Sequence, residues 1–169
     1  MTRFSSESFD KTIHDRSSFN SGNAAIDKYF RERASQEIKA DYARCYVLKE
    51  LSTNKVAGYY TLSASSVPLN DLPEFLIRKL PKYPNVPTAL IGRLGRDLDF
   101  KGQGVGSFLL ADAINRVANS CMAAHAITAE AIDENAARFY ADFGFRPLTE
   151  NRSIFFLPTK TALSISQKY

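Results

Sequence analysis

The chain has 169 residues, with 44% hydrophobic and 24% charged side chains, which is the composition of an ordinary globular protein. Its length predicts a single domain over residues 1–169. No apolar run approaches the roughly 20 residues of a membrane span, and residues 1–7 lack the apolar core of a secretory signal. Two cysteines and two histidines match no metal-site spacing. We therefore expect a cytoplasmic protein with no metal and no membrane association.

Positive charge exceeds negative charge only slightly, with 22 Lys and Arg against 18 Asp and Glu, but the cations are clustered. One cluster lies within residues 31–44 and another within residues 78–82. Clustered cations are typical of a surface that binds a phosphate-rich partner. For each residue taken singly, a solvated helix face is the alternative explanation.

In chain order, residues 1–19 are polar and predict an irregular segment. The turn at residues 20–23 predicts the start of a helix of about 15 residues. Its apolar residues recur at helical spacing: Ile26, Tyr29, Phe30, Ala34 and Ile38. Residues 44–51 and 55–65 are strand-like runs around a short polar turn, which predicts a hairpin.

An insertion at residues 68–87 is expected to contain a short helix at 71–80 and a connection punctuated by prolines. A strand at residues 88–94 then leads into a glycine-rich loop, and the loop into a helix that ends near residue 118.

The last third predicts a buried strand at residues 124–131 and a short helix with Asp133 as its N-cap. Gly144 is the expected C-terminal stop of that helix. A strand at residues 153–157 is expected to close the sheet. The order predicts an α/β fold: a mixed sheet with an antiparallel start, a parallel βαβ centre and helices on both faces.

The glycine-rich loop is the main indication of function. It runs from Lys101 to Gly106 between a strand and a helix, so bare backbone N–H groups and a helix N-terminus suit a phosphate or pyrophosphate. Its spacing does not fit the dinucleotide motif, and it lacks the Gly-Lys-Ser/Thr of a P-loop. The pattern Lys101-x-x-Gly104-x-Gly106 resembles the pyrophosphate loop of the GCN5-related N-acetyltransferases (GNATs), which hold acetyl-coenzyme A (acetyl-CoA).

A second segment supports this resemblance. Residues 135–140 (Asn-Ala-Ala-Arg-Phe-Tyr) and 143–147 (Phe-Gly-Phe-Arg-Pro) are similar to the last helix and strand of the GNAT core. Membership implies a mixed central sheet flanked by helices, with two parallel strands splayed apart at the acetyl-CoA site. The residues implied to contact acetyl-CoA are Leu94, Gly95, Arg96, Lys101, Gly102, Gln103, Gly104, Val105, Gly106 and Asn135. For Asn135, an ordinary polar position in a helix turn is the alternative.

Tyr140 matches the family position that donates a proton to the departing thiolate. A phenol with a pKa near 10 is protonated at neutral pH and can act as a general acid. The alternative is that Tyr140 only packs among the neighbouring phenylalanines. No general base is evident, because His125 begins a strand and is expected to be structural. This favours a substrate amine of low pKa, such as an α-amine near 7.7–8.

Further segments resemble one branch of the family, the acetyltransferase toxins of toxin–antitoxin pairs, which acetylate the amino group of aminoacyl-tRNA. They are residues 19–23, 58–63, 71–73, 78–84, 91–95 and 153–158. The resemblance implies an aminoacyl-tRNA acceptor end as substrate, an antitoxin with a ribbon-helix-helix region, and a homodimer. The chain departs from the branch at Gly95-Arg96, where Ala and an aliphatic residue are usual.

The basic residues Arg78, Lys79, Lys82 and Arg93 are the candidate tRNA contacts. For Arg93, an ion pair with a nearby carboxylate is the alternative. Two other functions stay open: a GNAT that acetylates a free polyamine, a peptide N-terminus or a lysine, and a non-enzymatic CoA-binding sensor.

Overall fold

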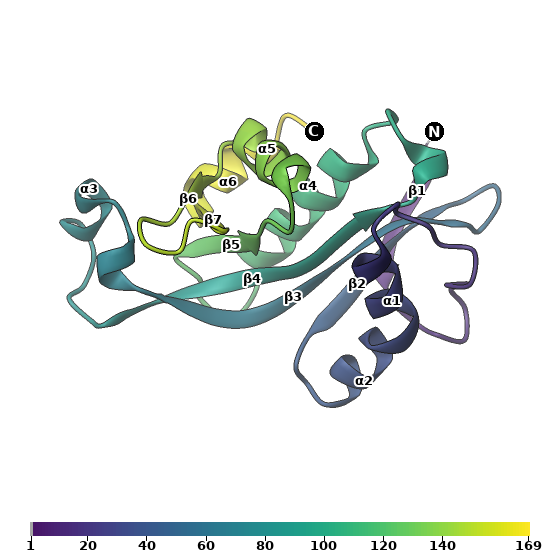
Figure 1. Cartoon of the computed structure of the whole chain (residues 1–169), viewed down its shortest axis with the longest axis horizontal. Helices are drawn as coiled ribbons and strands as arrows, with labels where there is room; N and C mark the ends of the chain where they lie inside the picture. Colours follow the sequence, from purple (N-terminus) through teal and green to yellow (C-terminus); the bar gives the residue numbers. More distant parts are fainter. Residues whose placement is uncertain (1) are drawn as a thin grey trace. The chain divides into compact units, whose positions relative to one another are not determined.

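The computed structural model describes residues 2–169, which form two compact units. Unit 1 comprises residues 2–63, 92–113 and 169, and unit 2 comprises residues 64–91 and 114–168. The strands make a seven-stranded mixed sheet in the order β1-β2-β3-β4-β5-β7-β6 (Figure 1). The predicted α/β class, with an antiparallel start and a parallel centre, is confirmed. No helix of residues 2–169 is long and apolar enough to cross a membrane.

The first three strands are antiparallel. They are β1 (Phe4–Ser8), β2 (Arg44–Glu50) and β3 (Val56–Pro68), and β2 and β3 form the predicted hairpin. The irregular segment predicted for residues 1–19 is wrong for β1, which pairs with β2 from Phe4↔Glu50 to Ser8↔Tyr46. The sequence of β1 does not alternate between apolar and polar residues, so only its pairing with β2 defines it as a strand.

The predicted 15-residue helix is two helices, α1 (Ala24–Glu32) and α2 (Ala34–Lys39). The predicted turn at residues 20–23 does cap α1: Oδ1 of Asn23, its last residue, accepts hydrogen bonds from the N–H groups of Ala25 and Ile26. The helix is interrupted at Arg33, because the φ of this residue, −116°, is not helical. The Arg33 N–H still donates a hydrogen bond to Tyr29 O. Apolar spacing continues across the break, which is why the pattern did not indicate it.

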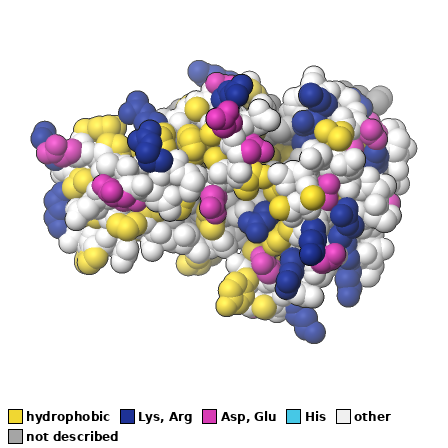
Figure 2. Space-filling model, viewed as in Figure 1, with side chains coloured by type: hydrophobic (Ala, Val, Ile, Leu, Met, Phe, Trp, Pro, Cys, Tyr) yellow, Lys and Arg dark blue, Asp and Glu magenta, His cyan; other side chains and the backbone are white. Residues whose placement is uncertain are grey.

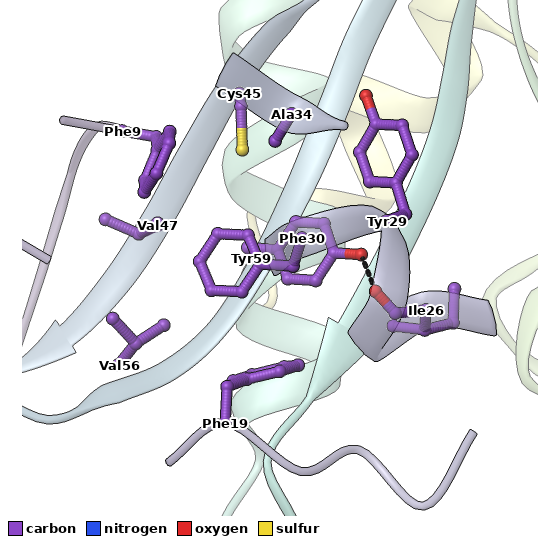
Figure 3. Close-up of a cluster of buried hydrophobic side chains, with 10 residues drawn as sticks. All are labelled: Phe9, Phe19, Ile26, Tyr29, Phe30, Ala34, Cys45, Val47, Val56 and Tyr59. Carbon is purple, nitrogen blue, oxygen red and sulfur yellow. Dashed lines mark hydrogen bonds between the residues drawn. The ribbon is translucent and has the colours of Figure 1, made fainter. Parts of the chain in front are cut away.

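An aromatic core lies between α1 and one face of β2 and β3 in unit 1 (Figure 3). The Tyr59 ring stacks on Phe30 with centroids 4.2 Å apart, and the Tyr59 hydroxyl donates to Ile26 O at 2.6 Å. Phe19 completes the cluster against both rings. A buried aromatic pair contributes about 0.5–1.5 kcal/mol beyond the area it buries, so this cluster fixes α1 on the sheet.

The helix α4 (Val105–Ala118) begins on the opposite face of β3 within unit 1. Successive side chains of a strand point to opposite faces, so Gly58 and Tyr60 face away from the Tyr59 cluster. A Cβ on Gly58 would lie 2.5 Å from Leu109 Cδ1, and the Tyr60 hydroxyl donates to Asp112 at 2.6 Å. Helices therefore cover both faces of the sheet in this unit.

Unit 2 contains the parallel pair. Strand β4 (Asn85–Arg96) pairs in parallel with β5 (Ala126–Glu130) from Thr88↔Ala126 to Ile91↔Ala129. Strands β6 (Arg146–Pro147) and β7 (Ile154–Pro158) follow, with β7 antiparallel to β5. The expectation that residues 153–157 close the sheet is wrong, because β7 lies between β5 and β6 and the two-residue β6 forms the edge.

The insertion predicted at residues 68–87 contains less helix than expected. A 3-10 helix, η1 (Leu69–Asp71), precedes the four-residue α3 (Glu74–Ile77), after which single turns continue to Leu80. Its apolar side chains pack with Val86, Leu148 and Phe156 in a second core. The chain then ends in a helix that was not predicted, α6 (Thr159–Ser166), which contacts β5 and β7.

Candidate active site

The predicted pyrophosphate loop starts from a short 3-10 helix, η2 (Leu98–Phe100), at the end of β4. Asp97 caps η2, because its Oδ1 accepts from Asp99 N at 2.9 Å. Phe100 is buried and makes an edge contact with Phe4, at 5.9 Å between ring centroids. These contacts anchor the first side of the loop on the sheet.

The loop itself is open to solvent. Gly102 and Gly104 both have φ of +75°, and a Cβ on either would meet nothing within 4 Å. The glycines are therefore required by backbone conformation and leave the backbone accessible. Residues 101–104 are exposed, and Gln103 folds back to donate from Nε2 to Asp99 O at 3.0 Å.

Helix α4 starts directly after this loop, at Val105. The first N–H groups of a helix have no intrahelical partner, and its dipole makes this end positive. The first turn of α4 carries no acidic side chain, whereas α1 has Asp27 there. Together with exposed Lys101, the arrangement can hold a phosphate or pyrophosphate.

The end of β4 contributes the strand segment of the candidate site. The pairing of β4 with β5 ends at Ile91↔Ala129, so Leu94 to Arg96 lie beyond the part of β4 that pairs with β5. Leu94 and Arg96 are half-buried, and Gly95 is buried. Backbone groups at such a position can pair with an extended ligand as an added strand would.

Helix α5 (Glu134–Phe143) carries Asn135 and Tyr140 in unit 2. As predicted, Asp133 caps it, accepting from Ala136 N at 2.8 Å, and Gly144 ends it with φ of +112°. Asn135 is exposed in the first turn, where its side chain is accessible to a ligand.

Tyr140 is buried, with 5% of its surface exposed, among the rings of Phe139, Phe145 and Phe155. Burial raises the pKa of the Tyr140 phenol above its ordinary value near 10, since the phenolate would lose its hydration. Across residues 2–169, no hydrogen-bond partner of its hydroxyl is found. The side chain is thus a core residue whose phenol is protonated at neutral pH.

The basic candidates lie on separate segments. Arg78 pairs with Glu74 at 2.9 Å, Lys82 donates to Ile77 O, and Lys79 is exposed beside them. Arg93 forms no ion pair within residues 2–169; its guanidinium lies 4.8 Å from the Tyr29 ring centroid. Figure 2 shows Lys and Arg side chains over the α3 segment and over α1 and α2.

The structure therefore places the predicted residues in two groups. Leu94 to Arg96 and Lys101 to Gly106 form one continuous feature of unit 1 with Arg93, whereas Asn135, Tyr140, Arg78, Lys79 and Lys82 belong to unit 2. The sequence pattern did not indicate Asp97 and Lys55 at the base of the loop. Lys55 forms ion pairs with Asp97, at 3.6 Å, and with Asp99. The one local signal for Asp97 is the sequence Asp97-Leu98-Asp99, because an aspartate can accept a hydrogen bond from the N–H two residues later.

Candidates for a base or a metal site are few. His125 is half-buried, its Nε2 has no partner within the described chain, and burial lowers its pKa. Its backbone joins Pro87 O and Thr159 N, which agrees with a structural position at the start of β5. Residues 2–169 contain no group of three side chains able to hold a metal ion.

Comparison with known proteins identifies the class. The Acetyltransferase (GNAT) family matches residues 10–145, so the chain belongs to the GNAT acetyltransferase family. It is similar to "Probable toxin TacT" of Sinorhizobium fredii (strain NBRC 101917 / NGR234), with 32% identity over 168 residues, 94% of this chain and 93% of that protein. A "tRNA-acetylating toxin" of Mycobacterium tuberculosis (strain ATCC 25618 / H37Rv) is 35% identical over 133 residues, 78% of each chain.

Solved structures agree with the fold. A KacT mutant in which a tyrosine is replaced by phenylalanine has a TM-score of 0.88 at 30% identity, covering 99% of this chain and 100% of that one. AtaT complexed with acetyl-methionyl-tRNAfMet has a TM-score of 0.85 at 32% identity, covering 93% and 95%. A mutant AtaT toxin bound to the C-terminus of the antitoxin AtaR and acetyl-CoA has a TM-score of 0.79 at 28% identity, covering 99% and 98%.

Proposed function

We propose that this protein transfers an acetyl group from acetyl-CoA to the α-amino group of an amino acid esterified to tRNA, and thereby blocks translation. The observation that carries the proposal is the exposed loop with left-handed Gly102 and Gly104 at the N-terminus of α4, in a chain of the GNAT family. The solved complexes of AtaT with acetyl-methionyl-tRNAfMet and with acetyl-CoA support this substrate pair.

The cofactor-binding residues divide by role. The backbone N–H groups from Gly102 to Gly106 bind the pyrophosphate, and Lys101 adds a positive charge beside it. Backbone groups of Leu94, Gly95 and Arg96 pair with the pantetheine arm. Gln103 and Val105 hold the loop and the start of α4, because Gln103 bonds to Asp99 O and Val105 is buried. Asn135 hydrogen-bonds the pantetheine from α5.

Tyr140 is the proposed catalytic residue. As the amine attacks the thioester carbonyl, the C–S bond breaks and the thiolate accepts a proton. The pKa of a thiol, near 8.5, lies below that of the phenol, and burial widens this gap, so complete transfer from Tyr140 is uphill. Tyr140 therefore acts first as a hydrogen-bond donor to the developing thiolate. Stabilising the leaving thiolate by donating this proton, partly or fully, is general-acid catalysis, which typically contributes about 10²–10⁴-fold in rate.

An aminoacyl ester suits a site without an evident base. Its α-amine has a pKa at or below about 7.7–8, so a large fraction is neutral at cellular pH, whereas a lysine amine near 10.4 would need deprotonation first. The amine loses its proton to solvent during attack. This difference favours aminoacyl-tRNA over lysine or polyamine substrates.

The α3 segment supplies a surface for RNA in unit 2. Phe75 and Tyr83 are exposed by 53% and 71%, beside the cations Arg78, Lys79 and Lys82. Exposed aromatic rings stack on unpaired bases, and neighbouring cations bind phosphates. Buried contacts of Leu69 and Leu72 in the second core anchor the segment.

Arg93 is the candidate contact in unit 1. Its guanidinium is exposed, and the Tyr29 ring 4.8 Å away fixes one face without neutralising the charge. The Tyr29 hydroxyl in turn donates to Glu37 at 2.6 Å. The guanidinium also donates to Gly92 O at 2.7 Å but has no carboxylate partner within residues 2–169, so its charge suits a phosphate near the acceptor end.

We also propose the assembly implied by the toxin branch: a single catalytic domain over residues 1–169, acting in the cytoplasm as a homodimer and neutralised by a ribbon-helix-helix antitoxin. The AtaT complex with the C-terminus of AtaR supports an antitoxin partner. Co-expression with a candidate ribbon-helix-helix antitoxin and light scattering of the purified protein test these two points.

The deciding experiment is mass spectrometry of acetyl transfer. Purified protein and acetyl-CoA are incubated with charged tRNA, uncharged tRNA, spermidine and a peptide. N-acetylated amino acids should be recovered only from charged tRNA. Tyr140→Phe should lower the rate by about 10²–10⁴-fold. The control Tyr42→Phe removes a hydroxyl from a side chain that is 76% exposed, and it should retain full activity.

Other outcomes would redirect the proposal. Transfer to spermidine or the peptide, with none to charged tRNA, would make the protein a different GNAT enzyme. Binding of acetyl-CoA without transfer to any amine would favour a sensor.

A further inference from the structure

The turn at residues 19–23, between β1 and α1, is part of the sequence resemblance but has no role in the chemistry proposed above. In the structure it lies against the base of the glycine loop. Asn20 N donates to Asp97 Oδ2 at 3.0 Å, and Leu98 N donates to Asn20 O at 2.9 Å. This reciprocal pair joins segments 77 residues apart.

Asp97 is the centre of this junction. It is buried, with 2% of its surface exposed, yet both carboxylate oxygens are used. One accepts from Asn20 N, and the other accepts from Asp99 N at the start of η2. Its own N–H donates to Ala57 O at 2.9 Å on β3, and Lys55 Nζ lies 3.6 Å from Oδ1 as a counter-charge. A buried carboxylate of this kind is stable only because its partners are all present.

The turn at residues 19–23 is also held by hydrogen bonds within itself and to α1. Asn20 Oδ1 accepts from Gly22 N at 2.9 Å, and Gly22 has φ of +84° with Leu98 Cδ2 3.4 Å from the position of a Cβ. Asp27, one turn into α1, accepts from both the N–H and the hydroxyl of Ser21. The turn is thus a rigid block fixed to α1, and Asp97 ties the glycine loop to that block.

We infer that Asp97 is a positioning residue for acetyl-CoA: held by Asn20 and Lys55, it sets the orientation of the glycine loop and so the affinity for the pyrophosphate. Asp97 does not itself touch the ligand, because its carboxylate is enclosed by protein donors. This inference rests on the proposed binding of acetyl-CoA at the loop. It gives the turn at residues 19–23, which is distant from the glycines in sequence, a part in binding at the loop.

The test measures CoA affinity and needs no acceptor substrate. Isothermal titration calorimetry with CoA is run on the wild-type protein, Asp97→Asn and Asp97→Ala, well below each melting temperature. Asp97→Ala removes both acceptors and should weaken CoA binding about tenfold or more, because the loop loses the charge-assisted hydrogen bonds that orient it. Asp97→Asn keeps one acceptor oxygen and should fall between. In acetyl transfer, the KM for acetyl-CoA should rise with little change in kcat.

A matched control separates positioning from loss of stability. Glu50 is also a buried carboxylate of unit 1, bonded to Arg3 and Thr53 through side chains. Glu50→Gln should lower the melting temperature without weakening CoA binding. Hydrogen exchange at residues 102–106 should quicken in Asp97→Asn and stay unchanged in Glu50→Gln.

The outcomes are distinct. Unchanged CoA affinity in folded Asp97→Asn and Asp97→Ala would overturn the inference, as would an equal loss in Glu50→Gln. If Asp97→Ala does not fold, Asp97→Asn and the exchange rates decide alone. A wild-type protein that binds no CoA would overturn the proposed function, and the inference with it.

Discussion

Gly95 offers a quantitative test of how the end of β4 is packed. A Cβ built on Gly95 would lie 2.5 Å from Ile26 Cγ2 and 3.3 Å from Tyr59 Cε1. Carbon atoms in contact prefer about 3.5–4.0 Å, so Gly95→Ala forces a shift. Ile26 has little room to retreat, because its carbonyl accepts the Tyr59 hydroxyl at 2.6 Å and its side chain is buried.

The expected cost of Gly95→Ala is about 1–3 kcal/mol of unfolding free energy from overpacking. The lower flexibility of alanine in the unfolded chain returns about 0.5–1 kcal/mol. The two terms leave a net loss of about 0–2.5 kcal/mol, centred near 1 kcal/mol, which should lower the melting temperature by roughly 2–4 °C at the centre of that range in a chain of this size. Because this strand also carries the proposed pantetheine contacts, CoA affinity should fall as well.

A double-mutant cycle identifies the cause. Ile26→Ala alone should cost about 2–4 kcal/mol by leaving a cavity. In the Ile26→Ala background, Gly95→Ala should cost almost nothing, since the opposing methyl group is gone, and the coupling energy should be about 1–2 kcal/mol. Urea unfolding followed by circular dichroism gives all four free energies. An equal cost of Gly95→Ala in both backgrounds would refute the steric explanation.

The rate of acetyl transfer should not decline as the pH rises toward about 10, because burial raises the pKa of Tyr140 above its ordinary value and keeps the phenol protonated. A loss of rate below pH 9 that is absent in Tyr140→Phe would contradict this. A thiol reagent should modify exposed Cys121 but not Cys45 in the native protein at about pH 8, since burial raises the Cys45 pKa to about 12; two fast equivalents before denaturation would argue against that burial. Asp133→Ala should cost about 1 kcal/mol through loss of the bond to Ala136 N, with Asp133→Asn nearly neutral, measured by urea unfolding; equal costs would exclude capping as the reason.

Features with a local signal were predicted from the sequence. These features depend on a few neighbouring residues: the capping turn at residues 20–23, the cap at Asp133, the stop at Gly144, and the hairpin of β2 and β3. Strand β1 and helix α6 carry no such signal, and each is defined by the elements that it packs against. The spacing of apolar residues could not indicate the interruption between α1 and α2 at Arg33, because the same spacing continues across it.

The residues of the candidate site also differ in whether a local sequence signal could indicate them. The glycine spacing alone indicates an anion loop, and Gly102 and Gly104 have the φ values that such a loop requires. The role of Tyr140 comes from family resemblance alone and stays a prediction. For Asp97, the sequence offered only the short spacing to Asp99, whose N–H it accepts. Its other partners, Asn20, Ala57 and Lys55, are distant in sequence and two of them contribute only backbone atoms, so its place at the junction could not be predicted.

The bond between Asn20 and Asp97 also orders events during synthesis. A ribosome makes Asn20 early, but the turn that contains it cannot dock until the chain has been extended through β2, β3 and β4 to Leu98. Contacts of such wide separation form late, because a long loop must close first. An incomplete chain released before that point holds no ordered anion loop. The proposed acetyl-CoA loop therefore becomes fixed to the turn only after more than half of the chain has been made.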